Sequence, residues 1–212
     1  MVACAGTPSV PMSSDALDSM RGGSLVLVQR ESPGFVAMTS GKGMFAVAGV
    51  GAAVAAGNKM VEENNISDPA TAISRGPAQD LATEFHLTLS GETALAESDS
   101  VNRLVALAQG SDYALDVVTK GWTYIYDGFN FEDYFVGYSS ELRLIDVNSG
   151  QVLSSGFCAY DAKKAGKGPV THEVLIADGA AYVKQELADA ADICTREFSE
   201  TLFSAPTVAR AR

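Results

Sequence analysis

A hairpin pattern occupies residues 134–160, which read YFVGYSSELRLIDVNSGQVLSSGFCAY. The first part, residues 134–147, alternates between apolar and polar side chains, as a half-buried strand does. The turn signal Asn148-Ser149-Gly150 follows, and residues of these types favour tight two-residue hairpin turns. Residues 152–160 then return as a second strand. The sequence therefore predicts an antiparallel β-hairpin here.

Two more strands and a long helix are predicted outside this hairpin. Residues 113–126 are rich in β-branched and aromatic side chains and end at a turn, so they extend the hairpin to a three-strand meander. The apolar run at 24–29 predicts an earlier, buried strand, and residues 35–39 are expected to be extended. Apolar residues spaced by three and four predict a long final helix at 171–203.

Between the first strand and the meander the pattern is mainly helical. The Gly- and Ala-rich run at 44–57 continues to residue 63 as an apolar helix. A second helix starts at Asp68, a good N-cap residue, followed by proline at the first helical position. We expect Gly76-Pro77 to interrupt it after one short segment. Two stretches remain less regular: 90–98 is expected to be a loop, and 101–108 a short helix or an extended segment.

The order of these elements predicts the fold class. A strand, helices, a three-strand meander and a helix make an α/β (α+β) fold: a single mixed or antiparallel sheet with helices packed on it and a long closing C-terminal helix. The 212 residues, 47% of them hydrophobic, suffice for one core. We assign residues 23–204 to this domain, 1–22 to a leader and flexible tether, and 205–212 to a disordered tail.

Charge and hydropathy narrow the possible partners. The net charge is −11. A field of that sign repels phosphate backbones, so we expect no nucleic-acid partner. No stretch reaches the roughly 18 consecutive apolar residues of a spanning helix.

Two of the three cysteines fall on elements that can meet. Cys158 lies in the return strand and Cys194 on the apolar stripe of the final helix. We predict a disulfide between them, which places the chain in an oxidising compartment. The alternative is two free buried thiols acting as small hydrophobic side chains. The predicted stripe consists of Ile176, Ala180, Val183, Leu187, Ala190, Cys194 and Phe198.

The third cysteine lies in a different context. Cys4 follows small residues and precedes a short tether that contains proline and serine. This arrangement resembles the end of a bacterial lipobox, whose cysteine is acylated, although the upstream apolar region is absent. We expect Cys4 to be a lipid attachment site, which anchors a protein without spanning the membrane. The alternative is an ordinary cysteine in the leader.

A group of aromatic residues surrounds the turn before the hairpin. Trp and Tyr are effective anchors at protein interfaces because they combine a large apolar surface with a polar group. The possible interface aromatics are Trp122, Tyr124, Tyr126, Phe129, Phe131 and Tyr134. The alternative is a cluster that packs in the core.

The motifs of catalysis and of cofactor binding are incomplete in this sequence. His86 and His172 have no neighbouring residue at metal-ligand spacing, and Ser40-Gly41-Lys42-Gly43 lacks the spacing of a phosphate-binding loop. We therefore expect no enzyme, no cofactor and no metal.

The turn region resembles a hairpin that recurs in bacterial envelope lipoproteins. Residues 141–155, ELRLIDVNSGQVLSS, match the pattern apolar-Arg-apolar-apolar-Asp-x-x-[Ser/Thr]-Gly-x-[Val/Ile]-Leu. Proteins with it include the curli-export channel family, domains like the N-terminal part of TolB, and lipoprotein activators of peptidoglycan synthases. The order of elements over 24–203 agrees more loosely. The long amphipathic hairpins of the curli-type channels are missing, so we do not expect a pore.

The resemblance implies a role in the cell envelope. Such domains serve as accessory or scaffold subunits that act through protein–protein contact, here in the periplasm and anchored to the outer membrane. The partners expected are other envelope proteins, the membrane through the Cys4 lipid, and a possible second copy of the chain. Two alternatives remain: a subunit of an oligomeric outer-membrane secretion or channel assembly, and a periplasmic protein that binds a small ligand or lipid. The run at 44–57 packs internally or meets a membrane or a partner.

Overall fold

A six-stranded mixed sheet organises the chain, and the computed structural model describes residues 9–39, 46–128 and 130–204. The strand order is β3-β1-β4-β5-β6, with β2 pairing with β4 beyond the end of β1. Strands β1, β2 and β3 run parallel to their neighbours, whereas β4, β5 and β6 form the predicted antiparallel meander. The strands are β1 Ser24–Arg30, β2 Val36–Met38, β3 Thr88–Ala96, β4 Tyr113–Asp127, β5 Asn130–Asp146 and β6 Gln151–Asp161. The predicted fold class is confirmed.

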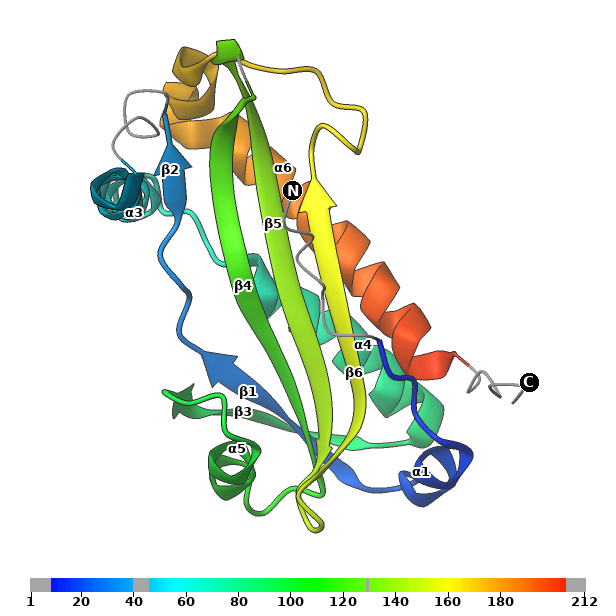
Figure 1. The fold of residues 1–212 in the computed structure, drawn as a ribbon. Coiled ribbons are helices and arrows are strands. Elements are labelled where there is room, and N and C mark those ends of the chain that lie inside the picture. The colour runs from blue at the N-terminus through cyan, green and yellow to red at the C-terminus, as the bar shows by residue number, and fades with distance from the viewer. Residues whose placement is uncertain (1–8, 40–45, 129, 205–212) are drawn as a thin grey trace, which may run out of the picture.

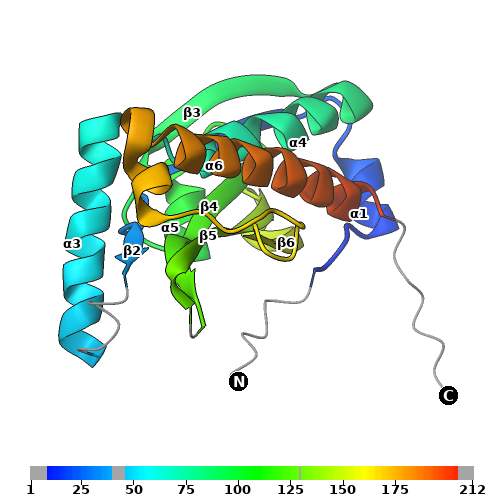
Figure 2. The ribbon, with the colours of Figure 1, turned by 90° about the horizontal axis from the view of Figure 1, so that it is seen from above.

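Helices cover the sheet unequally (Figures 1 and 2). Two long helices, α4 and α6, lie side by side over one face, α3 stands beside β2 at the sheet margin, and the short α5 packs against the opposite face. A short helix, α1, precedes β1 and packs against the main core. The helices are α1 Ser14–Ser19, α3 Ala46–Asn64, α4 Pro69–Phe85, α5 Val101–Leu107 and α6 His172–Phe203.

The main core lies between the sheet and the pair α4 and α6. Alternate residues of the meander, such as Leu115, Leu142 and Leu144, point into it and are fully buried. A smaller core under α5 gathers Leu104 with Ile145 and other residues from the other face. Both faces of β4 are therefore covered where it pairs with β1, which explains why its apolar pattern is nearly continuous there.

The β5–β6 turn forms where the sequence predicts it, but it consists of four residues, 147–150, rather than two. The Asp146 side chain accepts hydrogen bonds from the backbone N–H groups of Asn148 and Ser149, at 2.8 and 3.0 Å. Gly150 has a φ of 70°, a left-handed conformation that glycine adopts without a steric cost. A carboxylate and one glycine thus fix the register of the two strands.

Helix α4 starts as predicted but does not break where predicted. Asp68 caps it by accepting a hydrogen bond from Ala70 N at 2.9 Å, with proline in the first turn. The helix continues through Gly76 and Pro77 to Phe85. A Cβ on Gly76 would lie 2.3 Å from Thr195 Cγ2 of α6, and Pro77 is buried. Packing against α6 offsets the hydrogen bond that proline removes from the helix.

The expected loop at 90–98 is wrong, because most of this segment belongs to β3. This strand pairs with β1 only, and nearly all of its side chains are exposed. An edge strand with two solvated sides has no reason to alternate between apolar and polar residues, so the sequence carried no strand signal.

The final helix is interrupted, which corrects its predicted apolar stripe. Residues 177–180 have non-helical backbone angles, and Asp178 and Ala180 have φ values of 51° and 57°. The break rotates the first turn relative to the rest of α6. Ile176 is therefore 48% exposed and Leu175 is buried in its place, whereas the stripe from Ala180 to Phe198 is buried as expected.

Part of the expected tether packs into the domain. Met12 and Met20 are fully buried around α1, and Val10 forms an isolated antiparallel bridge with Ser155 of β6. The ranges 1–8 and 205–212, which include Cys4, lie outside the described residues.

The Gly- and Ala-rich run forms α3 from Ala46 onward and packs on β2. Gly49, Ala53, Gly57 and Met60 form its buried stripe. A Cβ on Gly57 would lie 1.9 Å from the carbonyl oxygen of Phe35. The absence of a side chain at Gly57 therefore allows the helix to pack closely on the segment that precedes β2. Over the ranges that the structure describes, no helix is both long and apolar enough to cross a membrane.

Candidate functional site

The predicted disulfide joins the meander to the closing helix. Cys158 of β6 and Cys194 of α6 are bonded, with their Cα atoms 5.5 Å apart, and both are fully buried. The bond closes a loop of 36 residues in sequence separation. A loop of this size stabilises the fold by about 4 kcal/mol in the chain-entropy model.

Three of the predicted interface aromatics lie in the core. Trp122, Tyr124 and Tyr134 are at most 4% exposed, and the Trp122 indole donates a hydrogen bond to the Pro33 carbonyl oxygen at 2.7 Å. The Phe35 ring packs against Trp122 and Tyr124, with centroid distances of 5.4 and 5.9 Å. Burial raises the pKa of Tyr124 to about 12. These three side chains therefore stabilise the core and offer no surface to a partner.

Tyr126 and Phe131, two more of the predicted aromatics, lie near the tip of the β4–β5 hairpin. Phe131 is 50% exposed and contacts the half-buried Tyr126 at a centroid distance of 5.3 Å. Phe129 lies outside the described residues. Ile125, on the neighbouring strand, is also about half exposed.

The first turn of α6 begins at the same end of the molecule. His172 packs against Tyr124 and Tyr134, with its Nε2 atom 3.2 Å from the Tyr124 hydroxyl oxygen. Figure 1 shows this turn beside the upper end of β4 and β5. Four large apolar side chains are exposed at this end, which we call the hairpin end: Phe131, Val174 and Ile176, and Ile125 on the opposite face of β4. The sequence placed Ile176 in the core and did not single out Ile125 or Val174.

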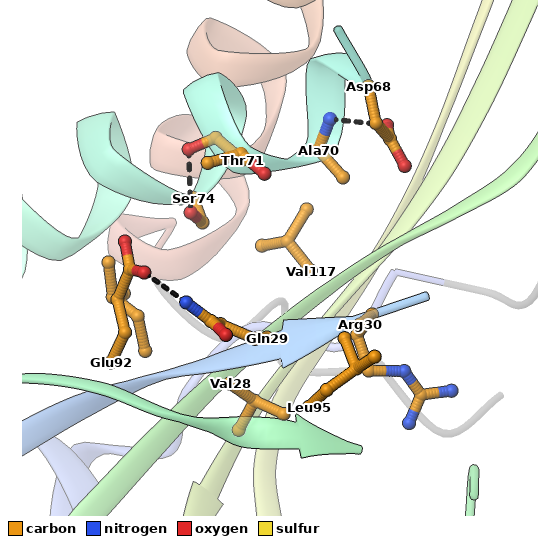
Figure 3. Close-up of a pocket in the computed structure, with 11 residues that line it drawn as sticks. Val28, Gln29, Arg30, Asp68, Ala70, Thr71, Ser74, Glu92, Leu95 and Val117 are labelled. Carbon is orange, nitrogen blue, oxygen red and sulfur yellow. Dashed lines mark hydrogen bonds between the residues drawn. The ribbon is translucent and has the colours of Figure 1, made fainter. Parts of the chain in front are cut away.

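A hollow of about 140 Å³ lies between α4 and strands β1 and β3 (Figure 3). Polar groups around it are already hydrogen-bonded: the Gln29 amide donates to the Glu92 carboxylate, and the Ser74 hydroxyl donates to the backbone carbonyl oxygen of Thr71 at 3.0 Å. Ligand pockets usually enclose roughly 300 Å³ or more. The hydrogen bonds around this hollow thus stabilise the fold, and its volume is small for a ligand.

A buried ion cluster, which the sequence does not predict, fixes the connection between β3 and α5. Asp116 of β4 is fully buried between two arginines. The Nε atom of Arg143 donates to its Oδ2 atom at 3.1 Å, and the Nε atom of Arg30 lies 3.8 Å from Oδ1. Both arginines also donate to backbone carbonyl oxygens, of Asp99 at 3.0 Å and of Ser98 at 2.6 Å. Arg143 lies between two leucines that point into the main core. This alternation is the sequence signal that Arg143 points to the other face of the sheet, toward α5.

The histidines and the acidic residues form no metal site in the described part of the chain. His86 ends α4 in a left-handed conformation, with φ at 54°, and His172 begins α6. Across residues 9–39, 46–128 and 130–204, no group of three potential ligand side chains comes together.

Comparison with known proteins gives structural likeness at low scores. No family model matches the chain, and the curated proteins contain no match to it. The PelC dodecamer from Paraburkholderia phytofirmans is 14% identical, with a TM-score of 0.41 over 94% of this chain and 97% of that one. Lipoprotein GNA1162 from Neisseria meningitidis is 16% identical, with a TM-score of 0.29 over 80% and 96%. The LpoB C-terminal domain from Salmonella enterica is 17% identical, with a TM-score of 0.26 over 68% and 86%.

One of these solved structures is named as a lipoprotein. Because the TM-scores and the identities are low, the likeness assigns no function to this chain.

Proposed function

We propose that this chain is a non-enzymatic accessory or scaffold protein of the bacterial cell envelope that acts by binding another protein. The exposure of four large apolar side chains at the hairpin end carries the proposal. Exposed large apolar side chains on one surface are typical of protein-binding sites, and Phe131, Val174 and Ile176 lie on the side of the sheet that α6 covers. The site stands on a rigid support, because the rings beneath it are buried and in contact.

The disulfide supports a location in the periplasm. Buried disulfides form and persist in oxidising environments such as the periplasm and are rare in the cytosol. The Cys158–Cys194 bond therefore favours export. Anchoring to the outer membrane through a lipid on Cys4 is part of the same proposal, and metabolic labelling with an alkyne fatty acid tests it. Label on the wild-type chain and none on a Cys4→Ser variant is the expected result, and an unlabelled wild-type chain would refute the anchor.

Site-specific photo-crosslinking tests the hairpin end. We place p-benzoylphenylalanine at Phe131 and, as a matched control, at Val152, which is 42% exposed at the opposite end of the meander. In cells of the native host, we expect one dominant adduct from position 131 and none from position 152. Identical adducts from both positions, or no adduct from position 131, would contradict the proposal.

The mass of the adduct separates the proposal from its alternative. An adduct with a different envelope protein supports the accessory role. An adduct of twice the mass of the chain supports a subunit of an oligomeric secretion or channel assembly instead.

A further inference from the structure

An apolar groove opens between the C-terminal end of β3 and α5. It has a volume of about 490 Å³. Its apolar walls come from both elements: Leu95 is 51% exposed and Leu107 is 38% exposed, with Ala96 and Ala106 between them. The groove lies at the end of the sheet opposite the hairpin end (Figure 1).

Helix α5 presents two different faces, which explains the groove. Leu104 is fully buried and packs in the smaller core. Arg103, Ala106 and Leu107 are spaced by three and four residues, so they share a second face, and this face lines the groove. The ion cluster of Arg30, Asp116 and Arg143 holds the β3–α5 connection in place, so the groove has a fixed shape.

One wall of the groove is a sheet edge. Within the described residues, β3 pairs with β1 on one side and with no strand on the other. It contains neither lysine nor proline, two residues with which proteins often protect such edges. Register shifts interrupt its pairing with β1 between Leu89 and Leu95, and the pairing is regular again at Leu95 and Ala96 beside the groove. Only another extended backbone offers the row of donors and acceptors that this edge can pair with.

Two charged side chains determine at which wall of the groove a bound carboxylate fits. Arg103 lines it from α5, is exposed, and has no ion-pair partner among the residues that the structure describes. Glu97 follows the last residue of β3 and would repel an anion at that wall. A carboxylate is therefore accommodated on the α5 side only, where a guanidinium can bind it through two hydrogen bonds.

We propose that this groove binds the extended C-terminal segment of a partner protein. Its apolar side chains contact Leu95 and Leu107, its backbone pairs with the end of β3, and its terminal carboxylate binds Arg103. A second copy of this chain is the less favoured occupant, because two chains with a net charge of −11 repel each other. The inference deepens the proposed protein-binding role, but it concerns a surface separate from the hairpin end. Failure of the groove experiment leaves the crosslinking result at Phe131 untouched.

Titrations followed by NMR test the groove directly. The probes are the peptide acetyl-Ser-Val-Thr-Val-Leu with a free carboxylate, the same peptide with a C-terminal amide, and decanoate. With isotope-labelled full-length protein, we expect the free-acid peptide to shift the amide signals of residues 94–97 and 103–107. We expect it to bind about tenfold more tightly than the amide, the effect of one charge-assisted hydrogen-bonded contact.

Matched variants separate the charge from the fold. Arg103→Gln should abolish the difference between the acid and the amide, whereas Arg75→Gln, an exposed arginine of α4 that pairs with Glu92 at 3.7 Å, should preserve it. Leu107→Asp should weaken both peptides. Circular dichroism of each variant verifies that it is folded.

Three outcomes would overturn the proposal: no shifts in the groove at millimolar peptide, equal affinities for acid and amide, or binding of decanoate alone. The last result would identify the groove as a fatty-acid site.

Discussion

Gly57 of α3 lies where any side chain would collide with the backbone of Phe35. The contact joins a marginal helix to the segment that leads into β2, and through Phe35 to the buried Trp122 and Tyr124. The lack of a side chain at Gly57 thus allows α3 to pack closely against Phe35. At Gly51, six residues earlier in the same helix, a Cβ would have no atom within 4 Å, so the two glycines form a matched pair.

Substituting each glycine by alanine should change stability in opposite directions. Gly57→Ala should lower the free energy of unfolding by about 3 kcal/mol, because the methyl group forces α3 away from Phe35. Gly51→Ala should raise it by about 0.5–1 kcal/mol, the gain in helix propensity. Urea denaturation followed by circular dichroism measures both. Equal effects of the two substitutions would show that α3 does not pack on Phe35.

Asp112 links the starts of β1 and β4 through a charge. Its Oδ2 atom accepts hydrogen bonds from the backbone N–H and the hydroxyl of Ser24, both at 2.8 Å, and these bonds hold its pKa below the usual value. A carboxyl whose pKa is lower in the folded state stabilises the fold above its unfolded pKa of about 3.9, and the contribution is lost as the pH falls through the folded pKa.

Asp112→Asn should therefore reduce the free energy of unfolding at pH 7 and have progressively less effect below about pH 4. Asp192→Asn on the exposed side of α6 serves as the control and should change stability little at either pH. Denaturant titrations at several pH values provide the measurement. A loss of stability on Asp112→Asn that is independent of pH would exclude the charge as its cause.

At the scale of elements, the meander is predictable and its surroundings are less so. Alternation, a turn signal and β-branched residues act locally, so the sequence predicts β4 and β6 to within one residue at each end and misses only the first four residues of β5. The continuity of α4 through Pro77 depends on Thr195, far along the chain, and the edge strand β3 has no apolar pattern to reveal it. Contacts between distant segments override local propensity in both cases.

The residues of the candidate site are likewise predictable where the signal is local and not where it depends on distant contacts. Trp122, Tyr124 and Tyr126 are separated by two residues and so share one face of β4, which is the face toward the helices. This spacing is the sequence signal that places Trp122 and Tyr124 in the core. No local signal marks the exposure of Ile176, because that depends on the break at 177–180.

The break in α6 depends on residues that adopt positive φ. Gly179 has a φ of 67°, and a Cβ there would meet no atom closer than 3.7 Å, so only the backbone conformation restricts it. We expect Gly179→Ala to lower the free energy of unfolding by about 1–2 kcal/mol. Gly168→Ala, where φ is not positive and the space is open, should have little effect. Thermal unfolding of both variants checks this, and a stabilising effect of Gly179→Ala would indicate that α6 is continuous.

At the scale of the whole molecule, the sheet separates two exposed apolar surfaces. The hairpin end stands at one end of the sheet and the β3–α5 groove at the other, with α4 and α6 closing one face between them (Figure 1). This arrangement suits a scaffold that contacts partners at both ends. It depends on the closing helix staying on the meander, which the Cys158–Cys194 bond secures.

The state of these two cysteines in the cell tests the central claim, an exported and disulfide-bonded domain, most directly. Protein isolated from its native host is alkylated before and after reduction, and the peptides containing Cys158 and Cys194 are weighed by mass spectrometry. We predict that both thiols are blocked before reduction and labelled only after it. Labelling of both thiols before reduction would contradict the disulfide, and with it the proposal that this protein acts in the cell envelope.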